Sequence, residues 1–126
     1  MTQVEFKQIA EKFGFTTFSL APWDETIGIY VDNDNARHKL IASCQINGEC
    51  KVYHPKMAQK RNADGIMKYF ILMDDRYNYY KKPKKLFYRL QSIIDYIRKL
   101  KAEIKKKDKL KIYVRRTSNG KERICE

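Results

Sequence analysis

The sequence contains few of the residues on which secreted and membrane proteins depend. Three cysteines in 126 residues are too few, and too odd in number, for a disulfide framework. No apolar run approaches the roughly 20 residues that span a bilayer. The first residues also lack the basic and apolar parts of a secretory signal. We therefore expect a cytoplasmic protein with reduced thiols and no membrane partner.

Motifs of enzyme chemistry are also scarce. Only two histidines are present. The sequence has no Gly-x-Ser-x-Gly elbow, no phosphate-cradling glycine loop and no dinucleotide fingerprint. The favoured interpretation therefore assigns no catalytic residue, no metal and no cofactor, and it leans away from an enzyme.

Positive charge is in excess, and it is segregated along the chain. The formal net charge is +12. Residues 1–54 hold 5 Lys and Arg against 7 Asp and Glu, whereas residues 55–126 hold 22 against 8. Such segregation exceeds what solubility requires and is typical of a protein that binds a polyanion. A hydrophobic content of 43% is enough for one folded domain over residues 1–126, with a near-neutral first half and a basic second half.

The first half has the local signals of a helix followed by an antiparallel meander of three or four strands. Thr2 and Glu5 form a capping-box pattern, and Gly14 is a natural helix stop. Asn47-Gly48 is a strong hairpin signal, for which we predict a two-residue turn. The expected elements are a helix over residues 3–13 and strands over residues 15–20, 27–31, 39–46 and 50–54.

The second half is dominated by one long amphipathic helix, predicted from Pro83 to Lys107 and packed on the sheet. Its apolar stripe recurs at intervals of three and four residues, at Leu86, Leu90, Ile93, Ile97, Leu100 and Ile104. Residues 56–61 read as a loop or a helical turn, and the apolar run 66–73 as a strand or a short helix. Alternation over residues 110–115 predicts a strand, and residues 121–125 complete a short C-terminal β-hairpin.

The candidate site is the segment where tyrosines alternate with cations just before the long helix. Proteins hold single-stranded nucleic acid with cations along the backbone and aromatic faces on which bases stack. We therefore predict a non-catalytic nucleic-acid-binding protein, of DNA or RNA, that contacts mainly phosphate. The predicted contact residues are Arg76, Tyr77, Tyr79, Tyr80, Lys81, Lys82, Lys84, Lys85, Arg89, Lys105, Lys106, Lys107, Arg115 and Arg116. Tyr88 is a further candidate for stacking, and some of these tyrosines are expected to cap the core instead.

Two other functions stay open. Small basic domains without motifs are common among phage and other mobile-element proteins, so the chain could dock on a nucleoprotein enzyme and inhibit or adapt it. The third function is a metal-dependent nuclease that uses Asp32, Asp34 and the Glu49-x-Lys51 pair. This Glu-x-Lys spacing and the order of elements loosely resemble the restriction-endonuclease-like fold, which would imply a helical carboxylate from Glu5 or Glu11. A solvated carboxylate at a strand end is the simpler interpretation of Glu49.

A zinc site is the last alternative. His38, Cys44, Cys50 and His54 are suitable ligand types. A two-residue turn at Asn47-Gly48 would place Cys44 and Cys50 on opposite faces of the hairpin. We therefore expect two buried or half-buried thiols and no metal.

Overall fold

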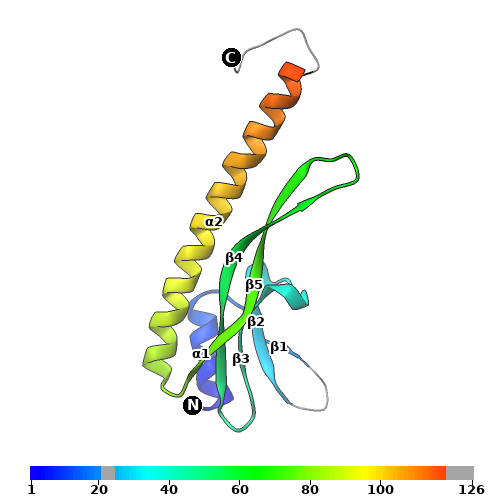
Figure 1. Ribbon diagram of the computed structural model, residues 1–126. Helices are drawn as coiled ribbons and strands as arrows, with labels where there is room; N and C mark the ends of the chain where they lie inside the picture. Colours follow the sequence, from blue (N-terminus) through cyan, green and yellow to red (C-terminus); the bar gives the residue numbers. More distant parts are fainter. Residues whose placement is uncertain (21–24, 119–126) are drawn as a thin grey trace.

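The computed structural model describes residues 1–20 and 25–118, with side chains except at Arg37 and from residue 110 onward. It confirms the α+β class: an N-terminal helix, a five-stranded antiparallel sheet and a long C-terminal helix that packs on it. The strands follow chain order across the sheet, so each one pairs with its sequence neighbour. Figure 1 shows the long helix running beside the sheet and, with the tip of the last hairpin, extending past the other strands.

Helix α1, Gln3–Lys12, begins and ends where its local signals predict. The Thr2 hydroxyl accepts a hydrogen bond from the Glu5 backbone, and the Glu5 side chain accepts one from the Thr2 backbone. Gly14 follows with φ near 80°, a left-handed conformation that favours glycine. The helix buries Phe6, Ile9 and Ala10 in the core.

The strands are β1 (Phe18–Ser19), β2 (Ile27–Tyr30), β3 (Leu40–Cys44), β4 (Cys50–Arg61) and β5 (Met67–Tyr80). Two short 3-10 turns, η1 (Val31–Asn33) and η2 (Arg37–Lys39), connect β2 to β3. Our expectation of a loop or helical turn over 56–61 was wrong, because β4 continues through Pro55 to Arg61. The ambiguous run 66–73 belongs to strand β5. Together β4 and β5 form the longest hairpin of the sheet.

The β3–β4 turn is one residue longer than predicted. The Gln45 N–H donates to the Glu49 carbonyl, and Gly48 lies in the turn with φ near 86°. This three-residue loop, with glycine at its left-handed position, sets the register of the hairpin. Cys44 therefore pairs directly with Cys50, and both buried thiols lie on the core face. The prediction that they face opposite sides was wrong.

A bulge interrupts the long hairpin at its middle. Tyr53 pairs with Tyr77 but Pro55 pairs with Met73, so one residue of β4 lies opposite three of β5. The Asp74 carboxylate stabilises the bulge because it accepts hydrogen bonds from both the backbone and the guanidinium of Arg76. A bulge is one of the few places where a proline fits within a paired strand.

Helix α2, Pro83–Ser118, is 36 residues long and continues well past the predicted end at Lys107. Residues 110–115 are helical, so the predicted strand there was wrong; residues 121–125 lie outside the described residues. Its stripe packs against the sheet as expected, with Ile104 at the margin and Leu86, Leu90, Ile93, Ile97 and Leu100 buried. A stacked pair, Phe13 and Phe87, joins α1 to α2 with ring centroids 4.9 Å apart. Over the described part of the chain, no helix is long and apolar enough to cross a membrane.

Candidate nucleic-acid interface

Four side chains form an aromatic and cationic surface on the sheet, here called the tyrosine patch: the half-buried Lys51 and Tyr53 and the exposed Tyr77 and Tyr79. Lys51 pairs with Tyr79 and Tyr53 with Tyr77, so all four project from the same face. This face is opposite the core, because the intervening residues Cys50 and Val52 are buried under the helices. The tyrosine patch therefore lies mainly on the sheet face opposite α1 and α2, although Tyr53 also packs partly against the core.

The rings of the tyrosine patch are held in a fixed arrangement. Tyr77 makes edge-on contacts with Tyr53 at 5.6 Å and with Tyr79 at 5.2 Å between ring centroids. The Lys51 ammonium lies 4.8 Å from the Tyr77 centroid and 5.8 Å from that of Tyr79, within the range of a cation–π contact. Tyr77 and Tyr79 nevertheless stay 42% and 51% exposed. Half-exposed rings that are packed in this way can accept a stacked planar ligand.

The hydroxyls of the tyrosine patch also interact. Tyr79 donates a hydrogen bond to the Tyr77 hydroxyl at 3.4 Å. Because ionisation would remove that donated proton, the hydrogen bond to Tyr77 raises the pKa of Tyr79 to about 12. Tyr79 is therefore neutral at physiological pH, and the positive charge of this surface comes from Lys51.

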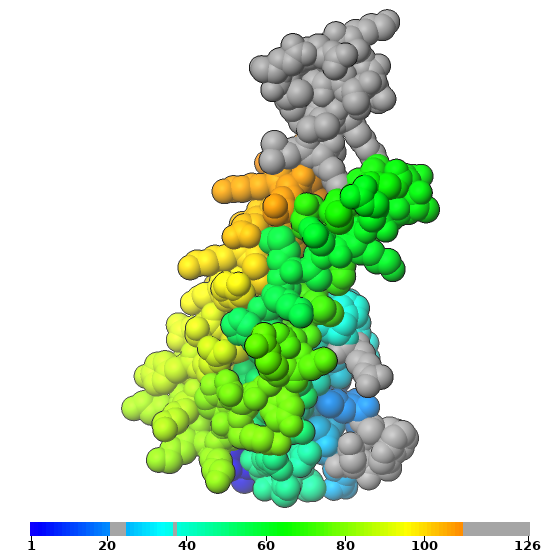
Figure 2. Space-filling view, viewed as in Figure 1, coloured from blue at the N-terminus to red at the C-terminus, as the bar shows by residue number. Residues whose placement is uncertain are grey.

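Four exposed lysines follow directly, here called the lysine cluster: Lys81, Lys82, Lys84 and Lys85. They lie at the beginning of α2, whose first turn contains no acidic residue. A helix N-terminus carries positive partial charge and favours anions. The lysine ammonium groups add to this positive charge, so a bound anion would stabilise the start of α2. In Figure 2, the end of β5 and the first turns of α2 (yellow-green) form a continuous band from which long side chains project.

Three other predicted contact residues lie near these surfaces but do not belong to them. Tyr80 pairs with Cys50 and packs against the core. The Arg76 guanidinium is held by Asp74, 2.9 Å away. Arg89 is half-buried and lies beside His54. Tyr77 and Tyr79 are therefore exposed just before the lysine cluster in the sequence, and Tyr80 belongs with the core.

The remaining predicted cations lie at the far end of α2. Lys105 is 20 residues beyond Lys85, or about 30 Å along the helix. Lys107 contacts the distal hairpin, where its ammonium lies 4.9 Å from the centroid of the Tyr69 ring. Lys105 and Lys106 are exposed. Arg115 and Arg116 lie in α2, in the part whose side chains are not described.

Sequence reasoning missed two members of the tyrosine patch, Lys51 and Tyr53. Both lie in a strand that was predicted correctly at its start, and their alternation with Cys50 and Val52 was visible. Lys51 had been considered only as part of a nuclease motif. The missing information was the pairing of β4 with the end of β5, which requires the tertiary structure.

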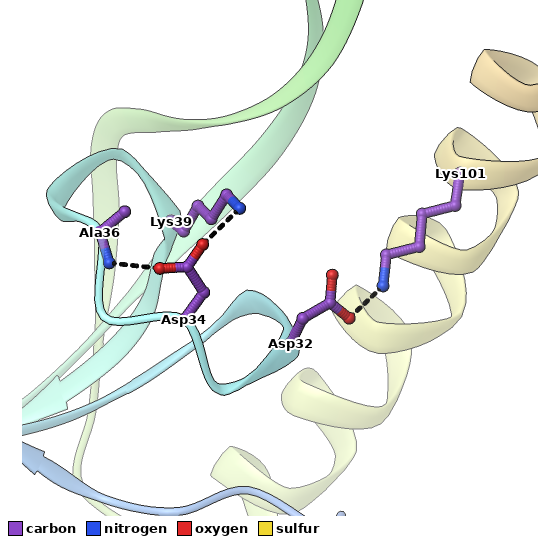
Figure 3. Close-up of polar contacts among 5 residues, drawn as sticks. All are labelled: Asp32, Asp34, Ala36, Lys39 and Lys101. Carbon is purple, nitrogen blue, oxygen red and sulfur yellow. Dashed lines mark hydrogen bonds and ion pairs between the residues drawn. The ribbon is translucent and has the colours of Figure 1, made fainter.

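The carboxylates of the nuclease hypothesis are not assembled. Asp32 and Asp34 follow β2, where Asp32 is paired with Lys101 of α2 and Asp34 with Lys39 at 2.7 Å (Figure 3). Glu49 lies in the β3–β4 turn, and β3 runs the length of the sheet between that turn and η2. The acidic residues therefore lie at opposite ends of the sheet.

The proposed zinc ligands are not gathered either. Within residues 1–20 and 25–118, no three His, Cys, Asp or Glu side chains lie close enough to hold a metal ion. Although Cys44 and Cys50 share the core face, His54 stacks on Tyr96 of α2 with centroids 5.6 Å apart, and His38 is exposed. The Cys44 thiol donates to the Gln45 carbonyl and the Cys50 thiol to Met1 Sδ. The interaction between the two neighbouring thiols lowers the pKa of Cys44 and raises that of Cys50.

Comparisons with protein-family models, curated proteins and solved structures found no match. The function of this chain is therefore inferred from its own residues and their geometry.

Proposed function

We propose that the protein binds single-stranded nucleic acid without catalysing a reaction on it. Bases stack on Tyr77 and Tyr79, and the lysine cluster contacts the phosphates that follow. The observation that carries this proposal is the continuity of the two surfaces: the tyrosine patch ends at Tyr79, and the first lysine of the cluster is Lys81. An aromatic platform beside a run of cations is the arrangement that single-strand-binding proteins use.

Single strands fit the tyrosine patch better than a duplex does. The bases of a duplex are already stacked on one another, so they offer no free face to an exposed tyrosine. Stacking on an aromatic side chain stabilises a bound single strand by about 1–3 kcal/mol per base. The distal cations Lys105, Lys106 and Lys107 extend the positive charge along α2, so longer strands gain further phosphate contacts. The free thiols Cys44 and Cys50 fit the cytoplasmic location that we infer.

Binding of labelled oligonucleotides at several salt concentrations tests the proposal. If about six lysines and arginines contact phosphates, log K against log salt should have a slope of about −4 on a single strand and about −5 on a duplex. The single strand should bind more tightly at every salt concentration because only it offers bases to the tyrosines. DNA and RNA of the same sequence are measured in parallel to identify the preferred nucleic acid.

A slope near zero, or no binding at low salt, would remove the electrostatic basis of the proposal. The basic surface would then serve a protein partner, and docking on a nucleoprotein enzyme would become the favoured function. Equal binding of duplex and single strand, with the expected slopes, would keep phosphate binding and reject base stacking on the tyrosine patch.

A further inference from the structure

A second feature lies on the helix side of the sheet, at the edge formed by β5. There α2 and the two long strands line a cleft with a volume of about 430 Å³. Its walls are Val52 and His54 of β4, Arg76, Tyr77 and Asn78 of β5, and Arg89 of α2. Tyr77 belongs to both the tyrosine patch and the cleft, so the two sites meet at the edge of the sheet.

Arg89 has an unpaired donor in this cleft. Its Nε is buried and is the one buried side-chain nitrogen or oxygen without a hydrogen-bond partner among the described residues. Its terminal nitrogen lies 3.5 Å from His54 Nδ1, and the His54 ring is stacked on Tyr96. Buried polar atoms without partners are rare in native proteins. The Arg89 guanidinium therefore keeps hydrogen-bonding capacity that no described protein group uses, and its side chain lines the cleft.

The charge around the cleft favours an anion. Two carboxylates directly precede Arg76 in the sequence: Asp74 is already engaged by Arg76 at 2.9 Å, and Asp75 is exposed. Arg89 has no acidic partner among the described residues, whose ion pairs involve Lys39, Arg76, Arg98 and Lys101. One uncompensated cation is therefore held in a recess, with the exposed amide of Asn78 available as a further donor.

We propose that this cleft binds a phosphate group, which accepts hydrogen bonds from the Arg89 guanidinium and the Asn78 amide. A guanidinium presents its N–H groups as a fork that matches phosphate oxygens. Where the source is nucleic acid, which rests on the proposed function, a strand stacked on Tyr77 passes over the β5 edge and places a backbone phosphodiester against Arg89. A free or terminal phosphate offers the same chemistry, so the test distinguishes these sources.

The first experiment observes Arg89 directly. In the full-length protein labelled with nitrogen-15, inorganic phosphate is titrated while the arginine Nε–H signals are followed by NMR. We expect the Arg89 signal to shift and saturate. Arg89→Lys keeps the charge but removes the Nε donor, so it should weaken phosphate binding by about tenfold, the effect of one lost hydrogen bond to a charged group. Arg98→Lys, an exposed position on the same helix, is the matched control and should bind like wild type.

Asn78→Ala keeps the test decisive if Arg89→Lys proves unstable. Asn78 is exposed, so its truncation should leave the melting temperature unchanged and weaken phosphate binding several-fold. If phosphate leaves the Arg89 signal unshifted and Asn78→Ala and Arg89→Lys bind oligonucleotide like wild type, the cleft proposal is wrong. The proposed function can still stand in that case.

The second experiment identifies the source of the phosphate. A single-stranded oligonucleotide without terminal phosphates should displace inorganic phosphate from the Arg89 signal if a backbone phosphodiester occupies the cleft. If only a 5′-phosphorylated oligonucleotide does so, the occupant is a terminal phosphate. If phosphate binds Arg89 and neither oligonucleotide binds the protein, the cleft serves a free phosphate compound and the proposed function fails by itself.

Discussion

The Lys51 ammonium lies 4.8 Å from the centre of the Tyr77 ring, although the two residues are 26 positions apart in the sequence. They come together because β4 pairs with the end of β5. This contact holds a cation at an exposed aromatic surface, where a phosphate and its neighbouring base could both be accommodated.

Removing the rings of the tyrosine patch should weaken binding of single strands. We expect Tyr77→Ala and Tyr79→Ala each to cost about 1–3 kcal/mol of binding free energy, the value of one base stacked on an aromatic ring. Tyr88→Ala is the matched control, because Tyr88 is 58% exposed but lies on α2. Fluorescence anisotropy with a labelled oligonucleotide measures the effect. Equal losses in all three variants would show that the patch has no special role.

Replacing the lysine cluster should separate binding from stability. The four exposed lysines, changed together to glutamine, should flatten the salt slope on a single strand by up to about three units, since each lost contact removes about 0.7. Thermal melting of the same preparations should stay nearly unchanged, since substitutions at exposed positions stay within about ±0.5 kcal/mol each. A variant that melts normally and binds like wild type would show that the cluster is only a solvated start to the helix.

Substitutions on the buried face of α2 should lower stability, unlike those in the lysine cluster. Ile93 is 2% exposed under the sheet, so Ile93→Ala should lower the free energy of unfolding by about 2–5 kcal/mol through lost burial and a cavity. Lys99→Ala, on the exposed face of the same helix, is the control. Urea denaturation measures both. A small loss at Ile93 would mean that α2 is not anchored by its stripe.

The Asp74 carboxylate in the bulge should make the free energy of unfolding depend on pH. The hydrogen bonds from Arg76, first from its side chain and then from its backbone, lower the pKa of Asp74 from 3.8 to about 2. Because the folded-state pKa is depressed, the stabilisation is fully present above pH 3.8 and is lost as the pH falls toward 2. Asp74→Asn should therefore show a smaller loss of stability over this interval than wild type.

Chemical denaturation at a series of pH values between 5 and 2 measures the Asp74 effect, a range set by the two pKa values. Asp95→Asn is the control for removing one negative charge, since Asp95 forms only an exposed 3.6 Å pair with Arg98 among the described contacts. Identical profiles for wild type and Asp74→Asn would contradict a stabilising role of the carboxylate in the bulge.

The hydrogen bond between the Tyr79 and Tyr77 hydroxyls predicts that Tyr79 ionises at an unusually high pH. Tyr79 should ionise at a pH of about 12 because it donates a hydrogen bond to Tyr77. Tyr77→Phe removes the acceptor and should lower the pKa of Tyr79, whereas Tyr88→Phe should leave it unchanged. The carbon-13 shift of the tyrosine Cζ, followed by NMR as the pH is raised, reports each ring separately. An unchanged Tyr79 titration in Tyr77→Phe would rule out the hydroxyl contact.

Much of the secondary structure could be predicted from the sequence because its signals are local. The Thr2–Glu5 capping box and Gly14 fixed the bounds of α1, and the three–four spacing from Leu86 to Leu100 identified the buried stripe of α2. The prediction of a strand over 110–115 was wrong, and the energetics of helix growth explain why. Adding residues to an existing helix is far easier than nucleating a new element, so α2 continues through alternating residues that by themselves suggest a strand.

The composition of the chain determined its charge, its apolar stripe and the presence of tyrosines beside lysines. Only the tertiary structure decided where those tyrosines point. Met73 and Tyr77 are four residues apart, which in a regular strand would put them on one face; the bulge at Asp74 instead leaves Met73 buried and Tyr77 exposed. One extra residue in the β3–β4 turn likewise brought Cys44 opposite Cys50. Strand register depends on pairing between distant segments, and a change of one residue moves every side chain to the other face, so residue spacing alone could not fix this surface.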